Sequence, residues 1–189
     1  MIGAIESAVL RPAQGELHAR LQIPKGAEIP HLQEQMAALQ EAANCRWCAQ
    51  RVPILWQEDG VDLGFGLIQS KNLAKNLSGC KEAFLIAVTL GLEVDRLLLR
   101  LSAQSSARHF ITDGLASALA EAACDAAEAQ IKGKLTCKPR FSPGYGDLPL
   151  SMQQALLQFL RADRIGITLT KNTLMVPQKS ITAIMGIMQ

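Results

Sequence analysis

The sequence predicts an α+β fold, a sheet with helices packed beside it. Three observations predict this class. The dipeptide Asp59-Gly60, a hairpin signal, lies between two strand-like segments. The run Ala83–Leu90 is continuously apolar with β-branched members, as a buried strand would be, and Ala107–Ile131 keeps the 3.6-residue apolar period of a long helix. A mixture of a hairpin, isolated strands and helices indicates α+β.

The length and composition indicate one globular unit. The chain has 189 residues, of which 49% are hydrophobic and 19% charged, so a packed core is feasible and disorder is not expected. We therefore predict a single domain over residues 1–189. It has a helical N-terminal part at residues 1–44 and a core at residues 45–189.

Local patterns predict the remaining elements. Breakers at Pro12, Pro24 and Pro30 leave an N-terminal helix and a turn within the first 30 residues. The later elements are a helix at His31–Ala43, strands at Arg51–Gln57 and Val61–Leu67, a helix at Glu93–Ala103, a stiff proline- and glycine-rich loop at Lys138–Pro149, a helix from Met152 with a capping box of Ser151 and Gln154, and strands at Ile165–Thr170 and Lys179–Ile187, linked through Met175–Pro177.

Charge and hydropathy argue against nucleic acid and membrane as partners. The net charge is only +2, the Lys and Arg residues are scattered, and aromatic residues make up 4% of the chain. The most apolar run, Ala83–Leu92, is too short to span a bilayer, and Glu6 interrupts the N-terminus before any apolar stretch of signal-peptide length. We therefore expect a cytoplasmic protein.

The cysteines and histidines give no clear chemical site. Five cysteines, an odd number, fit a reducing compartment. Cys45 and Cys48 form a C-x-x-C that is expected to close a helical stretch, where packing is favoured over half a zinc site or a thiol redox site. His18, His31 and His109 have no ligand spacing. No metal site is expected, although a thiol or zinc protein remains an alternative.

The run Arg140-Phe141-Ser142-Pro143-Gly144-Tyr145 is the most informative motif. Pro followed by Gly at the centre of Ser142–Tyr145 is typical of a type II turn, which presents its backbone groups outward. Arg140 offers a fork for a carboxylate, and Tyr145 offers an aromatic face. Together these groups suit a small zwitterion with a planar or cationic part.

This run resembles the R-x-[SA]-P-G-Y motif of the activation, or reactivation, domain of cobalamin-dependent methionine synthase. The resemblance continues through Leu119–Ala122, Ile165–Thr170, Met175–Pro177 and Lys179–Ile184. It is closest to the short, stand-alone members of that family. It implies their curved, mainly antiparallel sheet with packed helices.

In that family the ligand is S-adenosylmethionine, bound in an extended form along a shallow groove. The resemblance implies that Arg140 takes the polar end of the ligand. Backbone groups at Ser142, Gly144 and Tyr145 would line it, and Glu121 would supply an acidic contact. A sulfonium donates no hydrogen bond, so a carboxylate and an aromatic face suit it. No catalytic residue is expected, because methyl transfer to reduced cobalt needs alignment and desolvation rather than proton removal.

The family rescues oxidised cobalamin with one electron and a methyl group from S-adenosylmethionine. Nothing in this chain resembles the D-x-H-x-x-G motif that supplies the cobalt ligand. The cobalamin is therefore expected on a corrinoid-binding methyltransferase subunit, with flavodoxin or a ferredoxin-type protein as electron donor. The chain would be a methyltransferase component that is active only with that partner. Two alternatives are a non-catalytic S-adenosylmethionine sensor or assembly factor, and a reactivator of another corrinoid methyltransferase.

Overall fold

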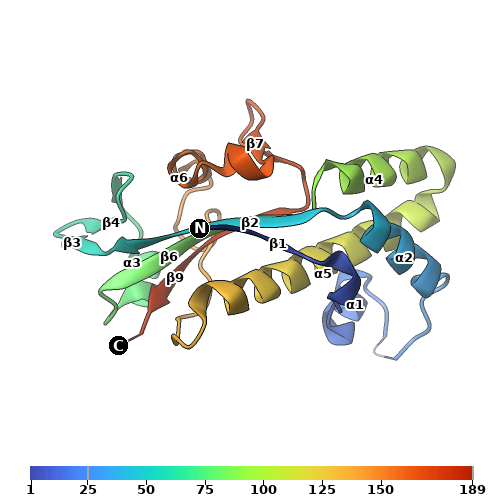
Figure 1. Ribbon diagram of the computed structural model, residues 1–189, viewed down its shortest axis with the longest axis horizontal. Helices are drawn as coiled ribbons and strands as arrows, with labels where there is room; N and C mark the ends of the chain where they lie inside the picture. Colours follow the sequence, from blue (N-terminus) through green and yellow to red (C-terminus); the bar gives the residue numbers. More distant parts are fainter. Residues whose placement is uncertain (25, 189) are drawn as a thin grey trace.

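The structure, a computed structural model, describes residues 1–24 and 26–188 (Figure 1). Its centre is a four-stranded sheet in which every neighbouring pair is antiparallel. The strands in spatial order are β1 (Ile2–Ile5), β2 (Cys45–Pro53), β6 (Glu82–Thr89) and β9 (Ser180–Ile187). The predicted α+β fold, with a mainly antiparallel sheet and packed helices, is confirmed. The strands predicted at 83–90 and 179–187 are confirmed as β6 and β9, and both are buried.

Both faces of the sheet are covered, which explains the continuous apolar run of β6. Successive side chains of a strand point to opposite faces. Phe84 and Ile86 accordingly lie in one core, and Leu85 and Ala87 lie in the other. A strand buried on both sides needs apolar residues at every position, so β6 shows no polar alternation.

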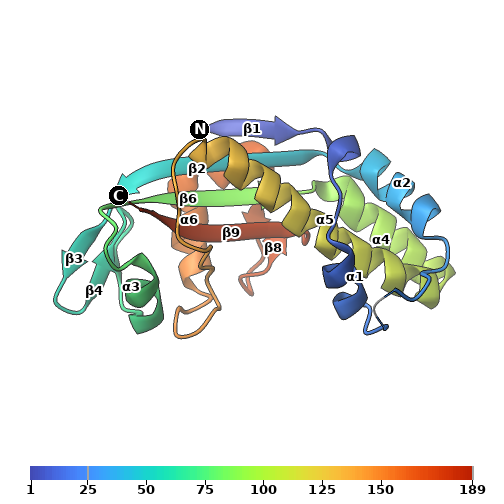
Figure 2. The same cartoon turned by 90° about the horizontal axis from the view of Figure 1, so that it is seen from below.

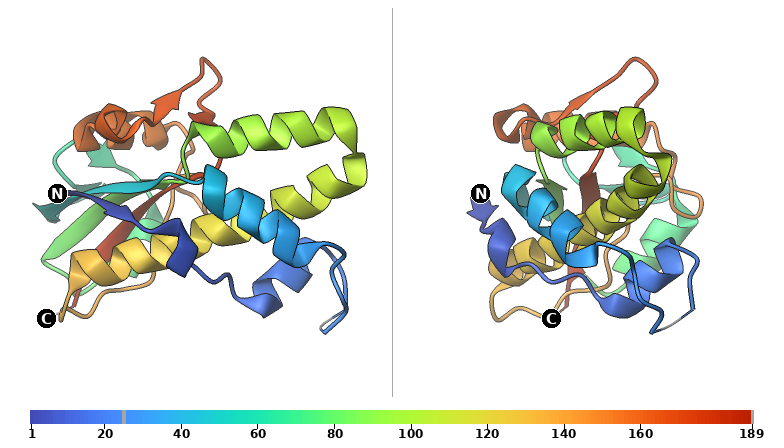
Figure 3. Two further views of the ribbon diagram at one scale, coloured as in Figure 1. Left: turned by 45° about the vertical axis from the view of Figure 1, so that its right-hand side comes forward. Right: turned by 90° about the vertical axis from the view of Figure 1, so that its right-hand side faces the viewer.

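Four helices share one core with the first face of the sheet. They are α1 (Gln14–Arg20), α2 (Leu32–Ala42), α4 (Leu92–Gln104) and α5 (Ser106–Lys132), with a short 3₁₀ helix η1 (Ser7–Val9) before them. Helix α5 lies on the strands, and the others pack mainly on α5 and on one another. Helix α4 returns alongside the first half of α5, and α5 then crosses one face of the sheet (Figure 3). The predicted helices at 31–43, 93–103 and 107–131 are confirmed.

Small and aromatic residues attach α5 to the sheet. Alanines such as Ala123 and Ala127 are fully buried, which lets the helix backbone approach the strands closely. Trp47 of β2 lies beneath the helix, and its Nε1–H donates to Oε1 of Gln130 at 3.1 Å. The indole also explains Gly3, because a Cβ at that position would lie 2.5 Å from the Trp47 ring.

The second layer covers the other face of the sheet (Figure 2). It consists of α3 (Lys71–Leu77), α6 (Met152–Leu160), the 3₁₀ helix η2 (Ala162–Ile165), the short strands β3 (Leu55–Gln57), β4 (Gly60–Asp62) and β5 (Leu67–Ile68), and the hairpin of β7 (Thr168–Leu169) and β8 (Met175–Val176). The predicted hairpin is present, with Gln57 opposite Gly60. Its second strand is split, because Gly64 and Gly66 adopt positive φ between β4 and β5.

The prediction of a helical N-terminal part at residues 1–44 is wrong in its first residues. Residues Ile2–Ile5 form β1, which pairs with Cys45–Cys48 some forty positions along the chain. The partner strand and its Trp47 lie far away in sequence, so the local pattern of these four residues could not predict the pairing. Gly3 favours the strand because it leaves room for the indole.

The prediction that the C-x-x-C closes a helical stretch is also wrong, because Cys45 opens β2. Residues three apart in a strand point to opposite faces, and Cys45 and Cys48 lie in different cores. They therefore cannot bind one metal ion together or form a disulfide with each other. Burial raises the pKa of each thiol to about 11, which keeps both neutral at physiological pH.

Two smaller predictions near the C-terminus need correction. Ser151 does not cap α6, because the turn begins earlier: the N–H of Met152 donates to the Pro149 carbonyl at 3.1 Å, and Ser151 itself has helical backbone angles. The strand predicted at 165–170 is reduced to β7, since η2 continues to residue 165 and Gly166 follows at φ 87°.

Asp147, which the sequence analysis did not single out, ties the proline- and glycine-rich loop to α3. Its carboxylate accepts the Ser70 hydroxyl and the backbone N–H groups of Lys71 (2.8 Å) and Asn72 (3.2 Å). Ser70 in turn accepts from the N–H of Leu73 at 3.0 Å. Two side chains thus satisfy the first N–H groups of the helix, which have no partner within it. The loop after the Pro-Gly turn is thereby fixed.

We expect Asp147→Asn to lower the melting temperature at neutral pH. The hydrogen bond from Ser70, followed by those from the α3 backbone, holds the pKa of Asp147 below its ordinary value of 3.8. A lowered folded-state pKa contributes stability above 3.8 that is lost as the pH falls through the folded-state value. Thermal melts across this range should show the gap between wild type and variant closing in acid.

Asp59→Asn is the control, since Asp59 makes no ion pair or side-chain hydrogen bond among the described residues. A gap between Asp147→Asn and wild type that does not depend on pH would contradict this account of the capping carboxylate.

Candidate functional site

The segment 137–141 lies along the outer edge of β9. Phe141 and Ile184 exchange two backbone hydrogen bonds of 2.9 Å, and the N–H of Lys138 donates to the Gly186 carbonyl at 2.8 Å. Cys137 lies opposite Ile187 in an antiparallel bridge, with the hydrogen bonds made by their neighbours. The segment therefore behaves as a short fifth strand, although it belongs to the loop that follows α5.

The predicted turn directly follows this edge and is confirmed. The N–H of Tyr145 donates to the Ser142 carbonyl at 3.1 Å, and Gly144 adopts φ 89°, as the third residue of a type II turn requires. The N–H of Gly144 is also used within the loop, donating to the Leu148 carbonyl at 2.8 Å. Two of the N–H groups expected to line a ligand are thus engaged in holding the corner itself.

Arg140 points from this edge toward α5, where three carboxylates surround its guanidinium. Nη2 lies 3.2 Å from Oε2 of Glu121, and Nη1 lies 2.7 Å from Oδ1 of Asp125 and 3.4 Å from Oε2 of Glu128. Side-chain exposure is 22% for Arg140 but 70% for Asp125. The predicted residues Arg140 and Glu121 are therefore brought together, and they contact each other directly.

Asp125 and Glu128 belong to the site although the sequence analysis did not assign them. Starting from Glu121, they follow at the i+4 and i+7 positions, which share one face of a helix. That spacing was visible in the sequence, but the position of Arg140 over the same face was not. The pairs with Glu121 and Glu128 are partly buried, whereas the pair with Asp125 is exposed and stabilises the fold by about 1 kcal/mol or less.

The network around Arg140 carries an excess of negative charge. Glu121 also lies 3.8 Å from Arg20, which pairs with Glu16, and Glu128 pairs with Lys132 at 2.9 Å. Four carboxylates meet three cations, so one negative charge is uncompensated. The members of the network are Glu16, Arg20, Glu121, Asp125, Glu128, Lys132 and Arg140. Such an arrangement can attract a cation and can exchange a carboxylate at Arg140.

A second polar contact continues this row along α5. Nζ of Lys179, just before β9, lies 2.7 Å from Oδ1 of Asp113 and 2.9 Å from Oγ of Ser117. The Lys179 side chain is only 12% exposed. Polar residues of α5 thus face the edge of the sheet on which β9 and Arg140 lie.

Tyr145 lies on the other side of the corner, toward α3. Its ring is 70% exposed and meets Phe141 edge to face, with ring centroids 5.5 Å apart. Together with Asn72, Lys75 and Lys138 it lines a depression of about 530 Å³. The guanidinium and the phenol therefore flank the turn on opposite sides, and Ser142 and Gly144 lie between them.

Cys124 is buried on α5 beside the carboxylates that surround Arg140. Burial raises the pKa of its thiol to about 12; Arg140 lowers it by a smaller effect, and the neighbouring carboxylates raise it further. At neutral pH the group is therefore a packed, neutral thiol.

Residues 1–24 and 26–188 offer neither a metal-binding cluster nor a membrane-spanning helix. No group of three or more His, Cys, Asp or Glu side chains in these residues is arranged to hold a metal ion. None of the helices they form combines the length and the apolar character that a bilayer crossing requires.

Comparison with known proteins gives a likeness in fold. No family model matches the sequence, and no curated protein matches it. The structure is similar to a crystal structure of the MetH reactivation domain bound to AdoHcy, with a TM-score of 0.72 and 18% sequence identity. The likeness covers 98% of this chain and 77% of that chain. The fold of this protein is therefore that of the MetH reactivation domain.

Proposed function

We propose that this chain binds S-adenosylmethionine and supports the reductive remethylation of a corrinoid held by a partner protein. The partner would be a cobalamin-dependent methionine synthase whose other modules lie on a separate polypeptide. The observation that carries the proposal is the contact between Arg140 and Glu121 beside the Pro143-Gly144 turn. This contact occurs in a fold shared with a domain that binds AdoHcy.

The charges of the site fit a sulfonium-bearing amino acid. A carboxylate about 4 Å from a sulfonium gives roughly 4 kcal/mol of gross attraction at an effective dielectric near 20. The one negative charge in excess in the network around Arg140 therefore favours a cationic ligand over a neutral one.

The carboxylate end of the ligand would reach Arg140 by exchange. In the ligand-free chain the guanidinium is held by Glu121, Asp125 and Glu128. Asp125 is the most exposed of the three carboxylates, and an exposed ion pair contributes little stability because water screens it. A ligand carboxylate would therefore displace Asp125. Glu121 would remain beside the guanidinium and face the sulfonium.

The proposed role specifies a methyl donor, a methyl acceptor and an electron donor. When bound, S-adenosylmethionine supplies the methyl group, and cobalamin on the corrinoid-binding subunit accepts it. Flavodoxin or a ferredoxin-type protein would supply the electron. The residues of this chain would align and desolvate the methyl donor, and none of them needs to move a proton.

Calorimetric titration with S-adenosylmethionine tests the site directly. Wild type should bind, and Arg140→Ala should abolish binding, because the guanidinium holds the polar end of the ligand. Arg96→Ala is the matched control, since among the described residues Arg96 forms an ion pair only with Glu93, on the exposed face of α4. Undiminished binding by a folded Arg140→Ala variant would contradict the assignment.

Glu121→Gln tests whether the Glu121 carboxylate recognises the positive charge of the ligand or only its shape. We expect it to weaken S-adenosylmethionine by about tenfold, close to 1.4 kcal/mol, while AdoHcy, which lacks the positive sulfonium, loses much less. Glu93→Gln, which also removes one exposed carboxylate, should change neither affinity. Equal losses for the two ligands would show that Glu121 does not face the sulfonium.

A remethylation assay separates catalysis from sensing. With a corrinoid partner, a reductant and S-adenosylmethionine present, the wild-type chain should accelerate methylcobalamin formation, followed by its absorbance. The Arg140→Ala variant should not. A chain that binds the ligand but leaves the rate unchanged would be a sensor or assembly factor. A response only to another corrinoid protein would make it the reactivator of that methyltransferase.

A further inference from the structure

Helix α4 carries a second apolar stripe on the side that faces solvent. Its core side is formed by the buried Val94 and Leu98. On the opposite side Leu92, Leu99 and Ala103 are exposed, Leu92 by 43% and Leu99 by 72%. Because successive residues of a helix are rotated by about 100°, these three side chains lie within about 40° of one another. Spacings of seven and four residues are typical of the seam along which two helices pack.

The position of α4 leaves this stripe open to a partner. The helix packs on α5 and α2, which cover its core side. Figures 1 and 3 show it at the margin of the molecule, at the end remote from the β3–β4 hairpin. It has 13 residues, and a rise of 1.5 Å per residue makes it about 20 Å long. The stripe is therefore long enough to lie along another helix.

Two charged residues follow one flank of the stripe. Glu93 and Arg100 are seven residues apart, so they lie within about 20° of each other around the helix axis. Glu93 pairs with Arg96, and its side chain stays 55% exposed. The side chain of Arg100 makes no ion pair or hydrogen bond with any residue that the structure describes. The flank thus holds a cation without a partner, two turns from a carboxylate that solvent can reach.

A second, antiparallel copy of α4 complements this pattern. A twofold rotation reverses the helix direction and brings each flank against the same flank of the second copy. With the axis beside Arg96, Leu92 of one copy lies opposite Leu99 of the second copy. Glu93 then lies opposite Arg100, and each contact is made twice. The two Arg96 side chains come near the axis, where each keeps its own Glu93 as a counter-charge.

We propose that the chain forms a weak twofold dimer through the exposed side of α4. One helix pair of this length buries less than the roughly 1,200 Å² of a standard interface, so we expect a dissociation constant on the order of 100 µM. A second copy is the occupant because the helix already presents both halves of each apolar and charged contact. The inference is independent of the proposed function. Helix α4 lies along the first half of α5, whereas Glu121 and its contact with Arg140 lie in the second half.

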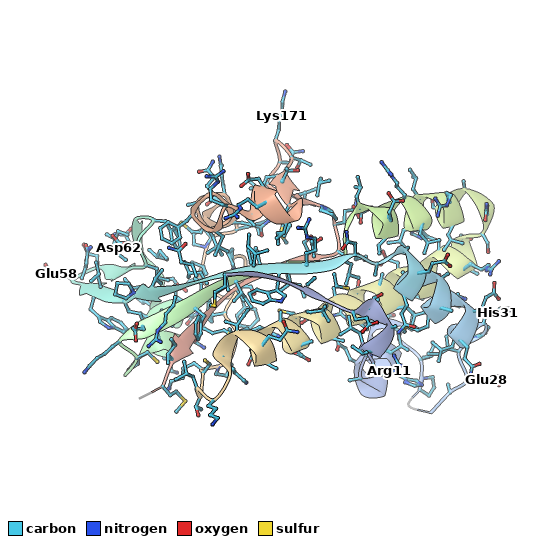
Figure 4. The ribbon with its side chains drawn as sticks, viewed as in Figure 1. Arg11, Glu28, His31, Glu58, Asp62 and Lys171 are labelled. Carbon is cyan, nitrogen blue, oxygen red and sulfur yellow. The ribbon has the colours of Figure 1, made fainter. Side chains whose placement is uncertain are left out.

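Exchange of the two charges tests the interface by sedimentation equilibrium. Glu93→Arg and Arg100→Glu should each weaken the dimer by about tenfold or more, because like charges then meet twice. The double variant Glu93→Arg, Arg100→Glu should recover most of the affinity, since each pair is restored with its signs exchanged. Glu58→Arg is the control for charge, because Glu58 lies at the tip of the β3–β4 hairpin, far from α4 (Figure 4).

Removal of one apolar side chain tests the stripe itself. Leu99→Ser should raise the dissociation constant of the dimer by about tenfold, because the variant loses the Leu92–Leu99 contact on both sides of the axis. Leu174→Ser is the matched control, since Leu174 is 60% exposed and lies between β7 and β8, outside this stripe. Far-ultraviolet circular dichroism should show that all variants keep the helical content of the wild type.

Several outcomes would overturn the dimer. A wild type that stays monomeric up to about 1 mM would do so. A dimer that survives Leu99→Ser and both single charge reversals would lie at another surface. A double variant as weak as the single ones would exclude the antiparallel arrangement. All variants should bind S-adenosylmethionine as the wild type does, and failure of the wild type to bind that ligand would instead refute the proposed function.

Discussion

The short ladder between residues 137–141 and the outer edge of β9 organises the rest of the site. Because Phe141 and Ile184 exchange two backbone hydrogen bonds, the segment follows the pleat of the sheet. Neighbouring side chains must then leave on opposite faces. Phe141 enters the core beneath α3 and α6, and Arg140 reaches the carboxylates of α5. The turn at Ser142–Tyr145 begins where this ladder ends, so its place is set by the same hydrogen bonds.

The corner separates two electrostatic environments. On the α5 side, carboxylates exceed cations around Arg140, which suits a cationic ligand. On the α3 side, Lys75 and Lys138 have no carboxylate partners among the described residues, and Tyr145 is exposed between them. A chain with almost balanced total charge thus presents surfaces of opposite sign on either side of one turn.

Much of the fold could be predicted because its signals are local. The apolar run of β6 and the helical period of α5 each lie within one continuous segment. The predictions that failed concern segments whose structure depends on other parts of the chain. Strand β1 depends on pairing with Cys45–Cys48. The prediction for the C-x-x-C failed because its segment is a strand through pairing with β1 and β6, which are both distant in sequence. The proposed cap at Ser151 failed because the helical turn begins at Pro149.

At the site, the sequence by itself determined the turn. The backbone preferences of Pro143 and Gly144 specify a type II turn whatever the surrounding structure. Arg140 and Tyr145 must therefore lie on either side of these two residues. Only the tertiary structure decided what Arg140 and Tyr145 face. The three carboxylates around Arg140 come from a helix that ends before the turn, and the two lysines beside Tyr145 come from α3 and from the segment along β9. Backbone preference acts between neighbours, whereas ion pairs join residues that only folding brings together.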